Sequence, residues 1–200
     1  MKKILLAAIT GAMLSACSNE TNNQQDNKPM TFLELAEKRF SVRMYDPKPV
    51  EQEKIDAILR AAQLAPTAKN QQPQKIYVLQ SKEAIKKINE VTSRAYQAPV
   101  VFIVCYDSNL AWTNPLDGNA SSGEMDATIV GTHMMLEAAE QGLGSCWIKW
   151  FNPQEVADAF AIPESEHPAF LLDVGYPASG AAPTKNHFDK RPIEDFVTYK

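Results

Sequence analysis

The uninterrupted apolar run VVFIVCY, residues 100–106, constrains the fold of this 200-residue chain more than any other feature. A run of this length without charged residues suits a strand that is buried on both faces, in the middle of a sheet. Three further segments, KIYVLQ, SCWIKWF and AFLLDVGYP, also have the composition of strands. Between them lie stretches with apolar residues at helical spacing, of which VEQEKIDAILRAAQLAP is the clearest. The sequence therefore predicts a sheet that is covered by helices.

Local signals predict where the helices begin and end. Thr31 and Ser81 are expected N-caps, Pro153 is expected to open a helix, and Gly142 is expected to end one. The helix that Gly142 ends carries apolar residues on more than one face, so we expect it to be largely buried. No G-x-G-x-x-G motif follows any strand segment, which argues against a dinucleotide-binding Rossmann unit.

The N-terminal residues resemble a bacterial export signal. Two lysines precede a mostly apolar run that is too short to span a bilayer stably. The run ends in Leu-Ser-Ala-Cys, which resembles the lipobox of bacterial lipoproteins and implies cleavage before Cys17 and lipidation of that cysteine. The chain then divides into a signal peptide (1–16), a lipidated cysteine with a flexible polar tether (17–29) and one domain (30–200). We expect a protein of the bacterial cell envelope, anchored through Cys17; the sequence leaves open which membrane and which face.

Composition argues against several other functions. The formal net charge is −4 and there is no basic stripe, so no nucleic-acid binding is expected. Cys105 and Cys146 each lie in an apolar strand segment, where a small buried side chain is the expected role, and whether they pair depends on the fold. The three histidines are isolated from one another and from the cysteines, which argues against a zinc site.

The segment RFSVRMYD carries Arg39, Ser41 and Arg43 at alternate positions. Alternate residues share one face of an extended segment, so two guanidinium groups and a hydroxyl would point the same way. That set suits a phosphate, which arginine can bind through two parallel hydrogen bonds. The alternative is an edge strand with two solvated arginines.

Five segments, in the same order, resemble the FMN-dependent nitroreductase family: RFSVRMY, APTAKNQQPQ, GLGSCWI, VGYP and KRP. The resemblance covers nearly all of residues 30–200 and indicates the short, single-domain form of the family. It implies an α+β fold with a central, mostly antiparallel sheet flanked by helices. It also implies a homodimer that binds FMN between its subunits, with Arg39, Ser41 and Arg43 on the phosphate.

The polar loop that follows the first long helix is the second part of the implied FMN site. By resemblance, Pro66, Thr67 and Ala68 come from the other subunit and lie along the flavin ring, mostly through backbone atoms. Asn70 and Gln72 would place amide groups near the ring, or else they cap their own loop.

The third part is the strand after GLG, together with the basic tail. Backbone amides near Ile148 and Lys149 would point at the edge of the flavin that becomes negative on reduction. Trp147 would lie beside them, or else it belongs to the core. Either Lys190 or Arg191 would reach the phosphate, and the sequence does not decide between them.

The implied activity is the ping-pong reduction of nitroaromatic compounds, quinones or similar small organic acceptors, with NADH, NADPH or another donor. Because FMN carries the chemistry, no catalytic side chain is expected. Nicotinamide cofactors are cytoplasmic whereas the lipobox implies export, so the physiological donor and acceptor stay open. The alternative is a membrane-anchored FMN-binding carrier or sensor without turnover.

Overall fold

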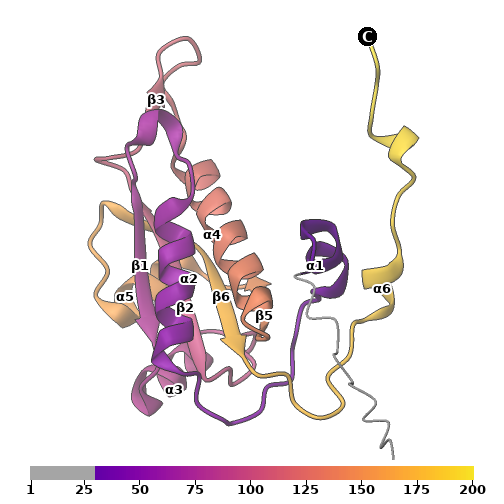
Figure 1. The fold of residues 1–200 in the computed structure, drawn as a ribbon. Helices are drawn as coiled ribbons and strands as arrows, with labels where there is room; N and C mark the ends of the chain where they lie inside the picture. Colours follow the sequence, from indigo (N-terminus) through magenta and orange to yellow (C-terminus); the bar gives the residue numbers. More distant parts are fainter. Residues whose placement is uncertain (1–29) are drawn as a thin grey trace, which may run out of the picture. The chain divides into compact units, whose positions relative to one another are not determined.

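Four antiparallel strands form the main sheet: β1 (Gln74–Leu79), β2 (Val100–Asp107), β6 (Glu166–Gly175) and β5 (Gly144–Ile148), in that spatial order (Figure 1). The structure is a computed structural model that describes residues 30–200, so the expected signal peptide, Cys17 and the tether lie outside the described residues. β2 pairs with β1 on one side and with β6 on the other, and residues 100–105 are buried. The predicted central strand and antiparallel sheet are therefore confirmed.

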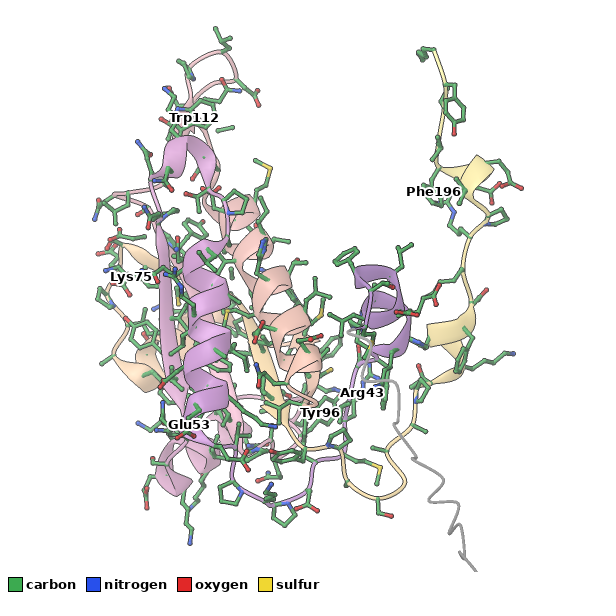
Figure 2. All side chains as sticks on the ribbon, in the orientation of Figure 1. Arg43, Glu53, Lys75, Tyr96, Trp112 and Phe196 are labelled. Atoms are coloured by element: carbon green, nitrogen blue, oxygen red, sulfur yellow. The ribbon has the colours of Figure 1, made fainter. Side chains whose placement is uncertain are left out.

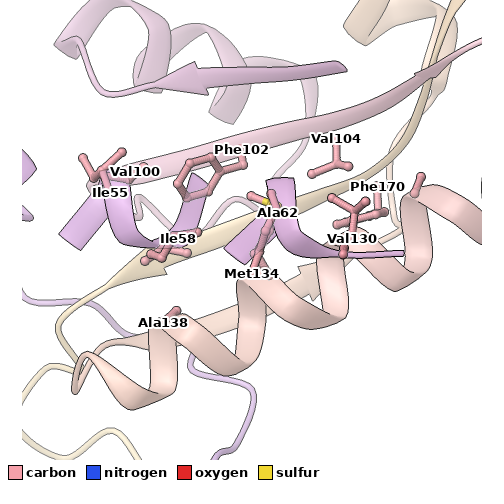
Figure 3. Packing of buried hydrophobic residues seen from close by; sticks show 14 of the residues in the cluster. Ile55, Ile58, Ala62, Val100, Phe102, Val104, Val130, Met134, Ala138 and Phe170 are labelled. Carbon is pink, nitrogen blue, oxygen red and sulfur yellow. The ribbon is translucent and has the colours of Figure 1, made fainter. Parts of the chain in front are cut away.

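Four helices cover the two faces of the sheet: α2 (Gln52–Leu64), α4 (Gly123–Glu140), α3 (Lys82–Val91) and α5 (Pro153–Phe160). α2 and α4 pack on one face, where Ile58, Phe102 and Met134 belong to one buried cluster (Figure 3). α3 and α5 pack on the other face, where Ile88 and Val156 belong to a second cluster. Successive residues of β2 alternate between the two clusters because side chains of a strand alternate between faces. This is the expected α+β arrangement.

Shorter elements complete the described chain: α1 (Phe32–Lys38), the 3-10 turn η1 (Ala68–Asn70), the hairpin of β3 (Thr113–Asn114) and β4 (Ala120–Ser121), α6 (Lys185–Phe188) and the 3-10 turn η2 (Ile193–Asp195). After β6 the chain leaves the sheet as an extended tail, drawn in yellow, that carries α6 and η2 (Figure 1). His187 of α6 meets Phe40 edge to face, with 6.4 Å between the ring centroids. The tail thus returns to the segment that follows α1.

The expected helix boundaries are found where the local signals place them. The Thr31 hydroxyl accepts a hydrogen bond from the Glu34 amide, and the Glu34 carboxylate accepts one from the Thr31 amide, which makes a complete capping box. Ser81 caps α3 through the Ala84 amide. Pro153 occupies the first turn of α5, and Gly142 follows α4 with a φ of 73°.

The expectation that α4 is largely buried is wrong for one side of the helix. Val130, Met134 and Ala138 are fully buried against the sheet and α2, whereas Met125 is 65% exposed and Ile129 is 38% exposed. The sheet covers only one stripe of α4, and no other element of the described chain covers the stripe that carries Met125 and Ile129. These two apolar side chains therefore form part of an open surface.

Candidate functional site

The segment with the alternating arginines is extended and lies along the free edge of the sheet. Arg39 has φ −66° and ψ 140°, and Ser41 forms a parallel bridge with Ser145 of β5. The Val42 amide donates to the Ser145 carbonyl at 2.9 Å, and the Val42 side chain is buried. A Cβ on Gly144 would lie 2.4 Å from the Val42 side chain, so only glycine lets the two backbones approach this closely. The extended conformation expected for this segment is confirmed.

Two unneutralised cations are held beside one hydroxyl in this segment. Arg39 Nε is buried without a hydrogen-bond partner, and Arg43 donates only to the Ser41 carbonyl, at 3.2 Å. Within residues 30–200, neither guanidinium group takes part in an ion pair. A buried, unpaired donor beside a second guanidinium favours an anion. This arrangement fits the phosphate of FMN, because the Ser41 hydroxyl adds a further donor to the two cations.

The thiol of Cys146 lies near this segment. Burial raises the pKa of Cys146 to about 11, and the nearby Asp173 carboxyl adds to that rise. Arg43, Ser41 and Arg39 act in the opposite direction and lower the pKa of this thiol. The positive potential of the segment is thus directed at the start of β5.

Residues of the tail line the same region and were not identified from the sequence. Ser41 and Arg43 share a pocket of about 200 Å³ with Phe40, Thr184, Asn186 and His187. Lys190 and Arg191, one of which is expected at the phosphate, are both exposed and do not line that pocket. Arg191 donates to the Asp195 carbonyl at 2.8 Å. In the sequence, the only signal for Thr184, Asn186 and His187 is that they precede KRP. These residues approach Ser41 because the tail folds back toward the segment that follows α1.

The loop of residues 66–72, called the ring loop below, has a strained backbone. Lys69, Asn70 and Gln72 have φ angles of 49°, 55° and 50°, which only glycine adopts without cost. The Thr67 hydroxyl accepts the Gln72 amide at 3.0 Å, and the Thr67 carbonyl accepts the Asn70 amide at 2.9 Å. The Gln72 side chain donates to the Asn70 carbonyl at 3.4 Å. Strain that a loop maintains with its own hydrogen bonds is found most often at binding sites.

Asp126 joins the ring loop to the first turn of α4, a role that was not predicted from the sequence. The Asp126 carboxylate accepts the Ala68 amide at 2.8 Å and the Ser122 hydroxyl at 2.7 Å, and only 3% of the residue is exposed. The hydrogen bond between Asp126 and Ala68 joins residues that are 58 positions apart in the sequence. From the sequence, an acidic residue early in a helix is expected only to stabilise the N-terminus of that helix. Its hydrogen bond with the Ala68 amide could therefore not be predicted.

We predict that Asp126→Ala lowers the free energy of unfolding by about 2 kcal/mol, because it leaves the half-buried Ala68 amide and the buried Ser122 hydroxyl without an acceptor. Urea unfolding measures the loss, and hydrogen exchange at the Ala68 amide should become faster. Asp56→Ala is the matched control, since Asp56 is an exposed carboxylate that accepts only from Gln52. Unchanged exchange at Ala68 in the Asp126 variant would contradict the role of this link.

One chain does not bring the ring loop together with residues 39–43, called the arginine segment below. Asp126, which holds Ala68, lies in the first turn of α4, whereas Ala139 in the last turn lines a pocket of about 200 Å³ with Arg39. The helix rises by about 1.5 Å per residue, so these two ends lie about 20 Å apart. Figure 2 likewise shows Arg43 far from Trp112, which neighbours the ring loop. The separation agrees with the expectation that the two parts of one site come from different subunits.

The residues of the expected site in β5 and directly after it lie partly in the core and partly at the surface. Trp147 stacks on Phe170 with 3.5 Å between ring centroids and an interplanar angle of 17°, so its indole belongs to the core. Ile148 is only 4% exposed. The Lys149 ammonium donates to Glu124 at 2.9 Å and to the Ala169 carbonyl at 2.6 Å. These three side chains are occupied by packing, an ion pair or hydrogen bonds. The backbone of the edge strand β5 is therefore the part that can bind a ligand.

The two cysteines of the domain are free, buried and unable to pair. Opposite them on β6 lie Pro168 and Asp173, five positions apart, and β6 itself separates the two cysteine-bearing strands. Disulfide bonding needs Cα atoms within about 7 Å, whereas five strand residues alone span about 16 Å. Burial raises the pKa of Cys105 to about 12 and that of Cys146 to about 11. The structure thus gives both a packing role.

Neither a metal site nor a membrane-spanning helix is found among the described residues. In the part of the chain from residue 30 onward, no three His, Cys, Asp or Glu side chains gather as a metal site. No helix of the same residues is both long enough and apolar enough to cross a membrane.

Comparison with known proteins gives a consistent result. The sequence profile of the nitroreductase family matches residues 36–97 and 92–176. A nitroreductase family protein from Clostridium difficile has a solved structure that matches with a TM-score of 0.78 and 38% identity, over 86% of this chain and 99% of that one. A protein of Methanothermobacter thermautotrophicus, provisionally named NADH dehydrogenase/NAD(P)H nitroreductase, is 32% identical over 80% of this chain and 84% of its own length. The FMN reductase [NAD(P)H] of Bacillus subtilis is 33% identical over 71% of this chain and 64% of its own length.

The fold and the site define an α+β protein whose sheet edge carries a segment with two guanidinium groups that form no ion pair within the described residues. Within that class, the chain belongs to the nitroreductase family.

Proposed function

We propose that this protein is an FMN-dependent oxidoreductase that takes electrons from NADH or NADPH and reduces a small organic acceptor, such as a nitroaromatic compound or a quinone. The observation that carries the proposal is the pair of unneutralised guanidinium groups of Arg39 and Arg43 beside the Ser41 hydroxyl. Relatives named as an FMN reductase and as an NADH dehydrogenase/NAD(P)H nitroreductase support the cofactor and the donor.

The residues of the chain would hold and orient the cofactor. Arg39, Ser41 and Arg43 would hold its phosphate, and backbone amides near Ile148 and Lys149, at the end of β5, would be donors to the ring. When bound, FMN supplies the hydride chemistry that no amino acid side chain provides. In the net reaction one NAD(P)H and one proton deliver two electrons and two protons, which convert a quinone to a hydroquinone. The polar ring loop of a second subunit would cover the ring and exclude water from it.

We propose that the protein is a homodimer. Large apolar side chains are exposed on α1, on α4 and along the tail: Phe32, Leu33, Met125, Ile129, Phe188, Ile193, Phe196 and Tyr199. Exposed apolar side chains in this number are typical of surfaces that a partner covers. A second subunit would also supply the ring loop that one chain leaves far from its own arginine segment. Sedimentation equilibrium tests the proposal, and a monomer in the presence of saturating FMN would contradict it.

We also propose that the chain is a lipoprotein of the cell envelope. The support is the lipobox ending in Cys17, preceded by two lysines and an apolar run. Mass spectrometry of the N-terminal peptide should find Cys17 lipidated, and an unmodified N-terminus on the mature protein would contradict this.

A visible absorption spectrum of the full chain, purified in a mild detergent, tests the proposed activity. We expect a yellow protein that bleaches under anaerobic conditions when NADH or NADPH is added and regains its colour with a quinone. A yellow protein that neither nucleotide bleaches would contradict the NAD(P)H dependence and would favour a carrier or sensor. A colourless protein that takes up no added FMN would overturn the proposed function.

A further inference from the structure

Trp112 is held next to the ring loop by the same turn of α4 that holds the loop itself. The Ser122 amide donates to the Trp112 carbonyl at 2.8 Å, and the Ser122 hydroxyl donates to Asp126, which in turn accepts the Ala68 amide. The Lys69 ammonium lies 5.7 Å from the centroid of the Trp112 ring, within the range of a cation–π interaction. A loop more than forty residues away in sequence thus places an indole against the strained part of the ring loop.

A pocket of about 300 Å³ opens beside this pair. It is lined by Gln71, Asn109, Leu110, Ala111, Trp112 and Thr113. In the described part of the chain no carboxylate pairs with Lys69. The carboxylate of Asp107, which precedes the pocket residues 109–113, accepts the Asn109 amide at 2.9 Å. The pocket therefore combines an aromatic wall with polar side chains, and Lys69, which does not line it, holds a cation without a counter-ion over the Trp112 ring.

We propose that Lys69 and Trp112 determine the specificity of the enzyme for its acceptor, and that they select an aromatic acceptor carrying a carboxylate. The indole would pack against the ring of the acceptor, and the ammonium would bind its carboxylate. The left-handed backbone at Lys69 fixes the direction in which this side chain leaves the loop. The inference rests on the proposed function, because it needs the ring loop to lie beside the flavin.

The chemistry of the acceptor does not involve Lys69 or Trp112 directly. In reduction of a nitro group to a nitroso group, two electrons from NAD(P)H and two protons break one N–O bond and release that oxygen as water. The carboxylate of the acceptor is unchanged, so its contribution is to binding. A charge-assisted hydrogen bond of this kind changes KM more than kcat when ground state and transition state use it equally.

The test compares 4-nitrobenzoate with the neutral 4-nitrobenzyl alcohol as acceptors for the full-chain holoenzyme. For Lys69→Gln, kcat/KM for 4-nitrobenzoate is expected to fall about tenfold more than kcat/KM for the alcohol, mainly through KM. Trp112→Leu is expected to raise KM for both acceptors while the FMN content, read from absorbance, stays at one per chain. Lys82→Gln, which replaces an exposed lysine of α3, is the matched control.

Four results would overturn the inference. Equal losses for both acceptors in Lys69→Gln, or no loss for either, would show that the ammonium does not select the carboxylate. If the wild-type protein binds FMN and reduces the alcohol without any preference for the carboxylate, the inference fails and the proposed function stands. If the wild-type protein binds no FMN, both fail together.

Discussion

Arg43→Ala is expected to lower the affinity of the protein for FMN by about one to two orders of magnitude, because a charge-assisted hydrogen bond contributes about 1.5–3 kcal/mol. The guanidinium of Arg43 forms no ion pair in the described residues, and its one hydrogen bond is to the adjacent Ser41 carbonyl. Its loss therefore removes little that stabilises the fold. The effect should appear almost entirely in binding of the anion.

Fluorescence titration of the flavin-free protein with FMN measures this change. Arg60→Ala is the matched control, because Arg60 is an exposed arginine of α2 that contacts only Gln63 of its own helix. The same titration with riboflavin, which lacks the phosphate, should show a much smaller effect of Arg43→Ala. Equal losses for FMN and riboflavin would disprove the assignment of Arg43 to the phosphate.

Asp173→Asn is expected to abolish a pH-dependent loss of stability of about 1.4 kcal/mol per pH unit between about pH 4 and pH 8. Asp173 is completely buried in β6, and neither carboxylate oxygen has a hydrogen-bond partner. Burial raises the pKa of Asp173 to about 8, whereas the unfolded chain has the ordinary value near 4. Between these values the folded protein keeps the proton and the unfolded chain releases it. Stability therefore falls as the pH rises, and above the folded pKa the full cost remains.

The groups around Asp173 do not titrate in this range. Burial raises the pKa of Tyr45 well above its usual value and that of Cys146 to about 11, so both stay protonated. Urea unfolding of the flavin-free protein between pH 5 and pH 7.5 should show a loss of about 3 kcal/mol that the asparagine variant lacks. Asp158→Asn, at an exposed carboxylate of α5, should keep the slope of the wild-type protein. The same slope in wild type and Asp173→Asn would mean that the carboxyl is not held protonated.

The parts of the fold that local sequence specifies were predicted correctly. The apolar run 100–106 became β2, and Thr31, Ser81 and Pro153 mark the starts of their helices. A cap depends on residues within three or four positions, and a central strand needs only to be apolar on both faces. The exposure of Met125 could not be foreseen in the same way, since apolar composition does not say which side of a helix the sheet will cover.

Some parts of the expected site could be predicted from the sequence, and others could not. Alternation of Arg39, Ser41 and Arg43 sufficed to place three groups together, because an extended segment presents alternate residues on one face whatever surrounds it. The partners that these groups meet, such as His187 in the tail, come from far along the chain. No periodicity or local motif encodes such contacts.

From its residues alone, this chain specifies a helix-covered sheet, an extended cationic segment and a family of proteins, since each depends on composition and short-range spacing. Only the tertiary structure reveals that Asp126 ties the ring loop to α4, that Lys69 meets Trp112, and that Asp173 is buried in β6 without a hydrogen-bond partner, where burial raises its pKa. Each of these depends on packing between segments distant in sequence. Burial and partner geometry, which set hydrogen bonds and pKa values, exist only once that packing has formed.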